Sequence, residues 1–320
     1  MTAALSLHDA AAVLAEPACI AGLETLSALP EQRVRAWDEV IVERWLPTAA
    51  ARWDIMGAIA SPTTLASRLP SLGTAALARA WLSSEQLAAS LLWFEWDVHR
   101  LGSAAAAPLC SVCLCDAVLA DAALRRPSSD PQAQAQARAR TLRACDREAA
   151  IATLERLVAQ LADDGELLHI ADLSARGRAA TRLCFFVRAD QILPWLRRCG
   201  WRGPASRLGP VLFAACSPFE RTAVQLEIDP SGALADYVGI ESLEWCTAVP
   251  HGQVAAWHRA WLQLGIEAPL PLLARWASWA GAGCTVGPER VDCDGFMFLK
   301  TAFDGESWQG KAYLGVRPSG

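Results

Sequence analysis

The sequence has little charge and no excess of positive charge. Charged side chains make up 20% of its 320 residues, the formal net charge is -5, and the isoelectric point is near 5.6. Proteins that bind nucleic acid generally present dense clusters of Lys and Arg that attract the phosphate backbone. We therefore expect no nucleic-acid partner.

A segment that would cross a membrane or direct secretion is also missing. The longest stretch without a charged residue, Leu101 to Cys115, contains Gly102 and Pro108 and is shorter than the roughly 20 apolar residues that span a bilayer. The first basic residue is Arg33, whereas a secretory signal peptide starts with a cationic segment. These absences predict a cytoplasmic protein with no membrane partner.

Several motifs of nucleotide, hydrolase and metal chemistry are absent. No Gly-x-Gly-x-x-Gly follows a predicted strand, and neither a Walker loop nor a Gly-x-Ser-x-Gly turn occurs. There is no Asp-Asp-x-x-Asp motif, because the pair Asp163-Asp164 only ends a predicted helix. A helical isoprenoid synthase with a magnesium cluster is therefore disfavoured. The five histidines also lack the close spacing of metal ligands.

Cysteine is present, but not in the pattern of a disulfide scaffold or a complete zinc site. Eleven cysteines, an odd number, are scattered through a large chain, which is typical of reduced thiols. Cys110, Cys113 and Cys115 have the spacing of half a zinc ribbon, but no second pair follows. Buried thiols and no metal site are the favoured interpretation. A cysteine-ligated metalloenzyme is the alternative.

Apolar residues, by contrast, are abundant. They make up 53% of the chain, which is enough for a continuous core in one domain spanning residues 1–320. Fourteen tryptophans accompany only two tyrosines. Because Trp is large and its indole N–H needs a partner when buried, this composition indicates either a heavily aromatic core or an aromatic cavity.

Hydrophobic periodicity predicts a helical lead-in over residues 1–90 and alternating strand pairs and helices over residues 91–320. The lead-in contains three predicted helices, at Leu7–Ala15, Glu31–Trp45 and Leu72–Leu82. The predicted strands are Leu92–Val98, Leu109–Cys115, Thr181–Arg188, Ala223–Asp229, Tyr237–Trp245, Gly295–Phe303 and Gly310–Val316. The later predicted helices are Gln136–Ala162, Ile192–Cys199, His251–Leu264 and Leu270–Ala280, with Val211–Cys216 ambiguous. The low-complexity composition of residues 125–135 predicts an exposed loop.

The predicted strands have two unlike faces. One is apolar, as in Phe94, Trp96 and Val98, and must pack against helices. The other combines charges with aromatic rings, at Trp93, Glu95, Asp97, Arg182, Phe186, Glu227, Phe298, Lys300, Lys311 and Tyr313. An antiparallel sheet tolerates water on one face, but these rings would then form exposed apolar patches. An antiparallel barrel with outer helices instead makes this face the wall of a lumen, where ligands bind.

We therefore predict an α+β fold of repeated helix and antiparallel strand-pair units, which close into a barrel with a polar and aromatic lumen. Two segments add a resemblance to a known family. The strand Leu92-Trp-Phe-Glu-Trp-Asp97 is similar to the early strand that holds the acidic residue in the indole-prenylating branch of the αββα-barrel (ABBA) prenyltransferases. The closing segments Phe298–Gly305 and Lys311-Ala-Tyr-Leu314 resemble that branch's strand pair, in which Lys-x-Tyr faces the diphosphate.

The resemblance implies an αββα barrel that transfers a prenyl group from an allylic diphosphate to an aromatic or peptide side-chain acceptor. The residue types suit this chemistry, because cations stabilise the leaving diphosphate and a carboxylate accepts the acceptor's proton. The predicted diphosphate ligands are Arg182, Lys300, Lys311 and Tyr313, the predicted catalytic residue is Glu95, and the predicted substrate contacts are Trp93, Asp97, Phe186, Glu227 and Phe298. No cofactor is required, with Mg²⁺ left open. The alternative is a non-catalytic protein that recognises a ligand or peptide, such as an accessory factor.

Overall fold

A computed structural model describes residues 9–10, 39–46, 53–59, 91–97, 109–113, 131–161, 165–216, 221–242, 251–280, 283–288 and 290–319. Within these residues, the helices are all too short or too polar to pass through a bilayer.

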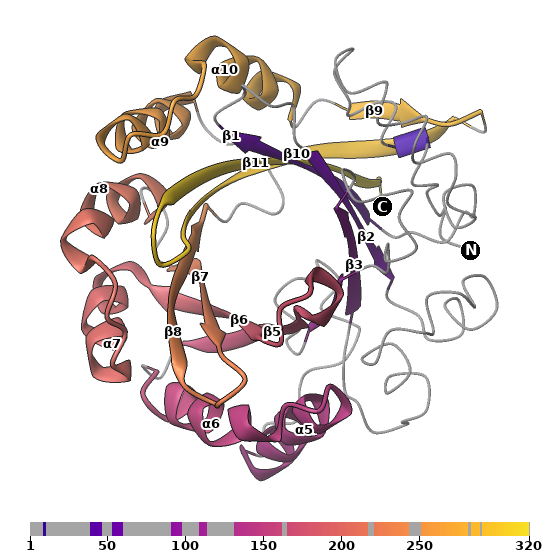
Figure 1. The fold of residues 1–320 in the computed structure, drawn as a ribbon. Coiled ribbons are helices and arrows are strands. Elements are labelled where there is room, and N and C mark those ends of the chain that lie inside the picture. Colours follow the sequence, from indigo (N-terminus) through magenta and orange to yellow (C-terminus); the bar gives the residue numbers. More distant parts are fainter. Residues whose placement is uncertain are drawn as a thin grey trace.

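The described residues contain one large antiparallel sheet of eleven strands. The strands are β1 Glu39–Leu46, β2 Trp53–Ile59, β3 Leu91–Asp97, β4 Leu109–Cys113, β5 Glu166–Asp172, β6 Thr181–Arg188, β7 Arg221–Ile228, β8 Leu234–Glu241, β9 Gly283–Val286, β10 Val291–Phe303 and β11 Trp308–Pro318. Seen along its axis, this sheet is strongly curled and has the shape of a barrel (Figure 1).

The strand pairings return to their starting point. Strands β1 to β8 pair in sequence, β8 pairs with β10, β10 pairs with β11, and β11 pairs with β1. Val40 therefore lies opposite Val316, although the two are separated by most of the chain. The short strand β9 adds to the outer part of β10. Side chains from distant parts of the sequence consequently face one interior.

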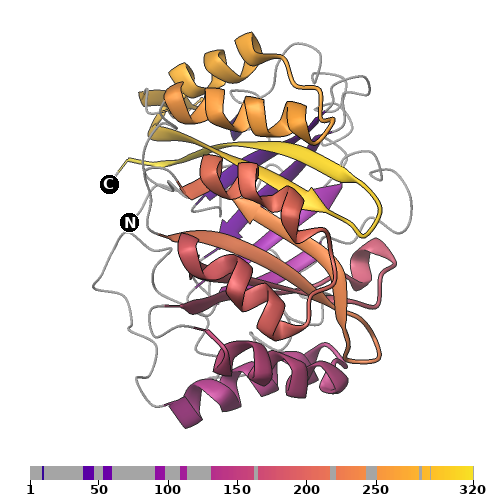
Figure 2. The same cartoon turned by 90° about the vertical axis from the view of Figure 1, so that its left-hand side faces the viewer.

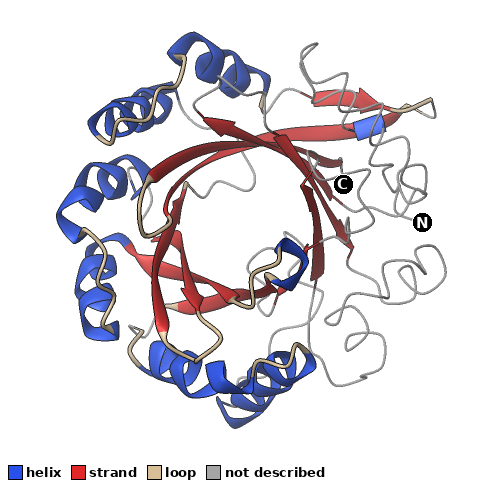
Figure 3. Cartoon of the chain, in the orientation of Figure 1, coloured by secondary structure: helices blue, strands red, loops and turns tan. Residues whose placement is uncertain are grey.

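Six α-helices in the described part of the chain pack on the outside of this curled sheet (Figure 3). They are α5 Pro131–Ala144, α6 Ile151–Ala159, α7 Ile192–Cys199, α8 Ala205–Cys216, α9 His251–Gln263 and α10 Leu270–Trp279. Figure 2 shows them stacked over the strands, from α5 and α6 at the bottom to α9 and α10 at the top. Two helices thus follow each of the strand pairs β3–β4, β5–β6 and β7–β8, so the predicted α+β alternation of strand pairs and helices is confirmed here.

The main hydrophobic core lies between the strands and these helices. Phe94 and Phe185, from the predicted apolar face, belong to it and are fully buried. Trp195 of α7 meets Phe185 edge to face at 5.1 Å, and its indole Nε1–H donates to the Leu157 carbonyl at 3.3 Å. Trp261 of α9 donates from Nε1 to Thr301 Oγ1 at 2.7 Å. Part of the tryptophan content therefore packs helices against the sheet.

The predicted helix at Glu31–Trp45 is wrong for its described part. Residues 39–46 form β1, and the adjoining β2 also lies within the predicted helical lead-in. The β-branched run Val40, Ile41 and Val42 favours a strand. Of the other two predicted lead-in helices, Leu7–Ala15 is described only at residues 9–10, which are helical, and residues 72–82 lie outside the described residues.

The single helix predicted at Gln136–Ala162 is also wrong. It is divided into α5 and α6 by a break at which Asp146 has a φ of 56°, a left-handed conformation that no helix interior contains. The predicted loop 125–135 is wrong from Pro131 onward, because α5 begins there, as a proline in the first turn allows. The rest of that loop lies outside the described residues. Strand β5 was not predicted.

Candidate functional site in the barrel

A cavity lies inside the curled sheet. It is lined by Ile41, Glu43, Met56, Trp93, Glu95, His169, Ala171, Leu173, Arg182, Gln225, Glu241, Phe298, Lys300 and Tyr313. These side chains come from β1, β2, β3, β5, β6, β7, β8, β10 and β11, together with Leu173 just after β5. Residues from both ends of the chain therefore build one site.

Two lysines lie directly opposite each other at this site. Lys300 of β10 and Lys311 of β11 are cross-strand neighbours, and both are buried, at 2% and 4% exposure. They are the only lysines in a sequence with 27 arginines. Like charges placed opposite each other destabilise a sheet. Each of the two amines therefore needs a negatively charged partner inside the barrel.

Lys311 is held by an acid and an aromatic ring of β1. Its Nζ lies 2.5 Å from Glu43 Oε1 and 3.5 Å from the centroid of the Trp45 ring. Burial and the neighbouring Lys300 lower the pKa of Lys311 to about 8, although Glu43 opposes this. Burial alone would raise the pKa of Glu43, but Lys311 and other cations lower it to about 2. Both groups are thus charged at neutral pH.

Lys300 belongs to a second polar network. It donates to Gln225 Oε1, and its Nζ lies 3.2 Å from Glu241 Oε1. Gln225 Nε2 donates to Glu241 Oε1 at 2.6 Å, and the Tyr237 hydroxyl donates to Gln225 Oε1 at 3.4 Å. Although burial lowers the pKa of Lys300, Tyr237 and Glu241 raise it above its ordinary value. The amine therefore stays charged inside the barrel.

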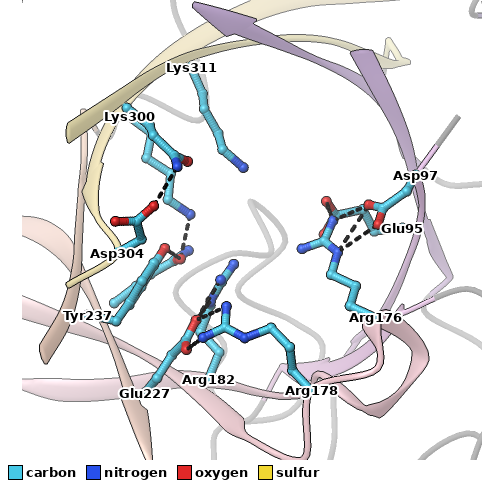
Figure 4. A network of polar contacts seen from close by, with 12 residues as sticks. Glu95, Asp97, Arg176, Arg178, Arg182, Glu227, Tyr237, Lys300, Asp304 and Lys311 are labelled. Carbon is cyan, nitrogen blue, oxygen red and sulfur yellow. Dashed lines mark hydrogen bonds and ion pairs between the residues drawn. The ribbon is translucent and has the colours of Figure 1, made fainter. Parts of the chain in front are cut away.

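Arg182 of β6 lies beside this network. Its guanidinium is 4.5 Å from the centroid of the Tyr237 ring, and its Nη2 donates to Glu227 Oε1 at 2.7 Å. Glu227 is fully buried and also accepts from Arg178 Nη2 at 2.6 Å. In Figure 4 these arginines and Glu227 occupy the region between the lysines and the opposite wall of the barrel.

The opposite wall carries Glu95 and Asp97 of β3, which both bind Arg176 (Figure 4). Arg176 belongs to the short 3-10 helix η7, Ser174–Arg176, in the connection between β5 and β6. Its Nε lies 3.0 Å and its Nη2 2.5 Å from Asp97 Oδ1, and Nη2 also donates to Glu95 Oε1. Burial lowers the pKa of Arg176, but Glu95 and Asp97 raise it above its ordinary value.

Glu95 and Asp97 are part of a larger group, here called the acidic wall: Glu43, Asp54, Glu95 and Asp97. Asp54 of β2 lies opposite Glu43 on one side and Asp97 on the other. Burial, and then the three neighbouring carboxylates, raise the pKa of Asp54 to about 7, although Trp45 Nε1 donates to its Oδ2 at 2.8 Å. The wall therefore places four acids side by side within the barrel, with Arg176 and Lys311 as cationic partners.

Three of these acids have the arrangement of a cation ligand set. Oxygen atoms of Glu43, Asp54 and Glu95 lie within 4.8 Å of one another, and the three residues are buried. Hard cations such as Mg²⁺ prefer carboxylate oxygens. Among the described residues, these three acids form the cluster that could hold a metal ion. The cysteine and histidine spacings in the sequence did not indicate this site.

Aromatic rings cover another part of the cavity. Phe298 and Tyr313 stack with centroids 4.2 Å apart and an interplanar angle of 5°. They form a buried cluster with Trp93, Phe296 and smaller apolar residues, and the amine of Lys300 lies 6.0 Å from the centroid of the Tyr313 ring. Burial, and then nearby carboxylates, raise the pKa of Tyr313 well above its usual value, so its phenol keeps its proton.

The structure places most predicted site residues together. Those that line the cavity are Trp93, Glu95, Arg182, Phe298, Lys300 and Tyr313. Lys311 and Glu227 contact the cavity-lining residues Glu43 and Arg182, and Asp97 contacts Arg176. Phe186 is not brought to the cavity lining. It packs with Leu168, Cys184 and Ala223 instead, and Arg221 lies 5.6 Å from its ring centroid.

Several residues of the site are not indicated by any motif in the sequence. Glu43 and Asp54 were missed because their segment read as helix, although Ile41, Glu43 and Trp45 alternate as a strand face would. Arg176 comes from a connection that carries no recognisable motif. No motif in the sequence marks His169 as a site residue. Burial together with Lys300 and Arg182 lowers its pKa to about 3, so it is neutral at physiological pH.

No protein-family model matches this chain, and no curated protein matches it. Any conclusion about function must therefore rest on the residues of the cavity.

Proposed function

We propose that this protein transfers a prenyl group from an allylic diphosphate to an aromatic or peptide side-chain acceptor inside an αββα barrel. One observation carries the proposal: the buried, directly opposed Lys300 and Lys311 lie beside the stacked rings of Phe298 and Tyr313. Paired cations suit a multiply charged anion, and aromatic faces suit a carbocation. An allylic diphosphate needs both during one reaction.

The first step is cleavage of the bond between the allylic carbon and the diphosphate oxygen. The electron pair leaves with the diphosphate, whose growing negative charge Lys300, Lys311 and Arg182 stabilise. Lys300 keeps its proton despite burial because Tyr237 and Glu241 raise its pKa. The Tyr313 phenol, also protonated, donates a hydrogen bond to the leaving group.

The second step is capture of the allylic cation by the acceptor. Phe298, Tyr313 and Trp93 shield the cation from water and attract it through their ring faces. The acceptor approaches from the acidic wall, where Glu95 lines the cavity and takes up the proton that the acceptor loses. Chemical roles are thus divided between two sides of one cavity.

The cationic side chains supply the charge that a metal provides in other diphosphate enzymes, so the reaction does not require Mg²⁺. If Mg²⁺ binds, the residues that would hold it are Glu43, Asp54 and Glu95, and it would supply additional positive charge for the diphosphate. The alternation of strand pairs with helix pairs supports the αββα architecture.

The test is incubation of the purified protein with dimethylallyl or geranyl diphosphate and a panel of indole, phenol and peptide acceptors. We expect pyrophosphate release and an acceptor whose mass has increased by one prenyl group. The variant Lys300→Met should lower turnover by about 100-fold or more, because one anion-stabilising donor is lost. Arg207→Met, which removes an exposed cation on α8, is the matched control and should leave turnover unchanged.

A second candidate function is recognition of a ligand or peptide without chemistry. It is favoured by the pairing of Lys300, Lys311 and Arg182 with carboxylates, which an anion would have to displace. Under this alternative, peptides bind but no diphosphate is consumed with any acceptor. That result, obtained with folded protein, would contradict the proposed transferase function.

A further inference from the structure

A guanidinium group is already bound at the acidic wall. Arg176 directs both Nε and Nη2 at Asp97, and Nη2 also donates to Glu95. This forked contact is the geometry by which carboxylates recognise a guanidinium rather than a compact ammonium. The wall is therefore shaped for a planar cation with several N–H donors.

The charge of the wall leads to the same ligand class. Glu43, Asp54 and Asp97 are successive cross-strand neighbours on β1, β2 and β3. Opposed like charges destabilise a sheet, and burial increases the cost of each charge. With Arg176 displaced, an indole or phenol acceptor would leave Glu95 and Asp97 without a compensating charge, whereas a cationic acceptor would complement them.

The bound guanidinium is carried by a connection rather than by a barrel strand. Arg176 lies in η7, and the next residue, Gly177, has a φ of 70°, which only glycine adopts without strain. Arg178, two residues on, is half exposed. Exchange of the Arg176 side chain for an incoming group would therefore require movement of η7 and not of β3.

We infer that the acceptor is a guanidinium group, as in an arginine side chain of a peptide, which takes the place of Arg176 at Glu95 and Asp97. This inference rests on the proposed transferase function and names its acceptor class. The lysine pair and the acidic wall then bind substrates of opposite charge in one cavity.

The chemistry balances for this acceptor. The bond between the allylic carbon and oxygen breaks, and its electron pair leaves with the diphosphate. One guanidinium N–H proton passes to Glu95 as that nitrogen's electron pair forms the new bond to the allylic carbon. The product is a prenylated guanidinium and free diphosphate, and Glu95 then releases its proton to water.

The decisive experiment offers dimethylallyl diphosphate to the full-length protein with four acceptors: the N-acetyl amides of arginine, citrulline, lysine and tryptophan. Citrulline is the matched control because it has nearly the same shape as arginine but no charge. We expect prenylated arginine by mass spectrometry, with citrulline at least about 100-fold poorer because charged hydrogen bonds to buried carboxylates are lost.

The outcomes separate this inference from the proposed function. If the prenyl group is transferred to tryptophan while arginine stays unmodified, the acceptor inference is wrong and the transferase function stands. If no pyrophosphate is released with any acceptor, the transferase function itself fails and the inference fails with it.

Two variants test the place of binding. Asp97→Asn should lower kcat/KM for arginine by about 30-fold while leaving the KM for the diphosphate unchanged. Asp190→Asn, which removes the acid of an exposed ion pair with Arg188, is the control and should have no effect. Equal losses for arginine and tryptophan acceptors in Asp97→Asn would overturn the assignment.

The variant Arg176→Ala gives a readout that does not need catalysis. Because it vacates the acidic wall, millimolar methylguanidinium should raise its melting temperature, whereas neutral methylurea should not. The wild-type protein, whose wall is occupied by Arg176, should respond less to methylguanidinium. No difference between the two compounds in the folded variant would contradict binding at this wall.

Discussion

The rarest residue types of this chain gather at one place. Its two lysines and two tyrosines, Lys300, Lys311, Tyr237 and Tyr313, are all buried in the barrel. Elsewhere the chain uses arginine for positive charge and tryptophan or phenylalanine for aromatic packing. Lysine is a compact point charge whose proton affinity responds to its surroundings, and tyrosine adds a hydroxyl to a ring. The proposed function gives these four residues a chemical use inside the barrel.

Asp54 provides a test of the acidic wall at the residue scale. Burial and neighbouring carboxylates raise its pKa from an ordinary 3.8 to about 7 in the folded protein. The folded state therefore binds this proton more tightly than the unfolded chain, so the contribution of Asp54 to the unfolding free energy is present below about pH 4 and is lost as the pH rises through 7.

We expect Asp54→Asn to remove this loss. As the pH is raised from 4 to 8, the unfolding free energy of the wild type should fall by up to about 4 kcal/mol relative to that of the variant. Each unit of pKa difference between the folded and unfolded states is worth about 1.4 kcal/mol. Urea titrations at several pH values would measure it. The exposed Asp236→Asn is the control and should follow the wild type. Parallel curves for Asp54→Asn and wild type would show that Asp54 titrates normally.

At the scale of elements, the closing hairpin was predictable because its signals are local. The Asp304 carboxylate accepts from the backbone N–H of Glu306 at 3.0 Å and of Ser307 at 2.8 Å, and Gly305 has a φ of 102°. These residues specify the turn, and the alternation on either side specifies β10 and β11. The lysine pair followed from this hairpin, so that part of the site was accessible from sequence.

Strand β1 shows why the rest of the site could not be predicted from the sequence. Its partner β11 lies at the other end of the chain, and the contact between Glu43 and Lys311 joins residues 268 positions apart. Nothing near Glu43 in the sequence records that pairing, and a proline before the segment made a helix equally acceptable. Half of the acidic wall therefore depends on long-range pairing, which periodicity alone does not encode.

Gly315 of β11 tests how tightly the aromatic side of the cavity is packed. A Cβ atom at this position would lie 2.0 Å from Cζ of Phe296, a buried ring in the cluster with Phe298 and Tyr313. Gly315→Ala should therefore displace the ring and lower the unfolding free energy by about 1 to 3 kcal/mol. Urea denaturation followed by tryptophan fluorescence would measure this.

The matched control for Gly315→Ala is a glycine in another strand. A Cβ atom at Gly283 of β9 would only reach the Cys293 carbonyl oxygen, at 3.9 Å. Gly283→Ala should change the unfolding free energy by less than about 0.5 kcal/mol. Equal effects of the two substitutions would mean that the ring of Phe296 does not pack against Gly315.

At the scale of the whole molecule, the proposed function depends on the seam where β1 and β11 meet. The pairing of β1 with β11 brings Glu43 to Lys311 and places the acidic wall within the same enclosure as the lysine pair. An open sheet would separate these charges and expose them to water, which would weaken their interactions with each other and with substrates. Closure of the ring is therefore a condition for the proposed chemistry.

A double-mutant cycle across this seam tests closure directly. Val42 of β1 lies opposite Leu314 of β11, and both are buried in the main core. Each substitution to alanine should lower the unfolding free energy by about 2 to 4 kcal/mol, because buried methyl groups are lost. Since the two side chains are in contact only if the seam is formed, we expect the double variant to deviate from additivity by about 0.5 to 1 kcal/mol.

The control cycle combines Val42→Ala with Leu154→Ala. Leu154 is equally buried but belongs to α6, on the side of the ring away from β1 and β11 (Figure 1). These two substitutions should add within about 0.5 kcal/mol, as distant sites do. If the seam pair is as additive as this control, β1 and β11 are not packed together in solution. The lysine pair and the acidic wall would then not share one cavity, and neither the transferase function nor the guanidinium acceptor would have a site.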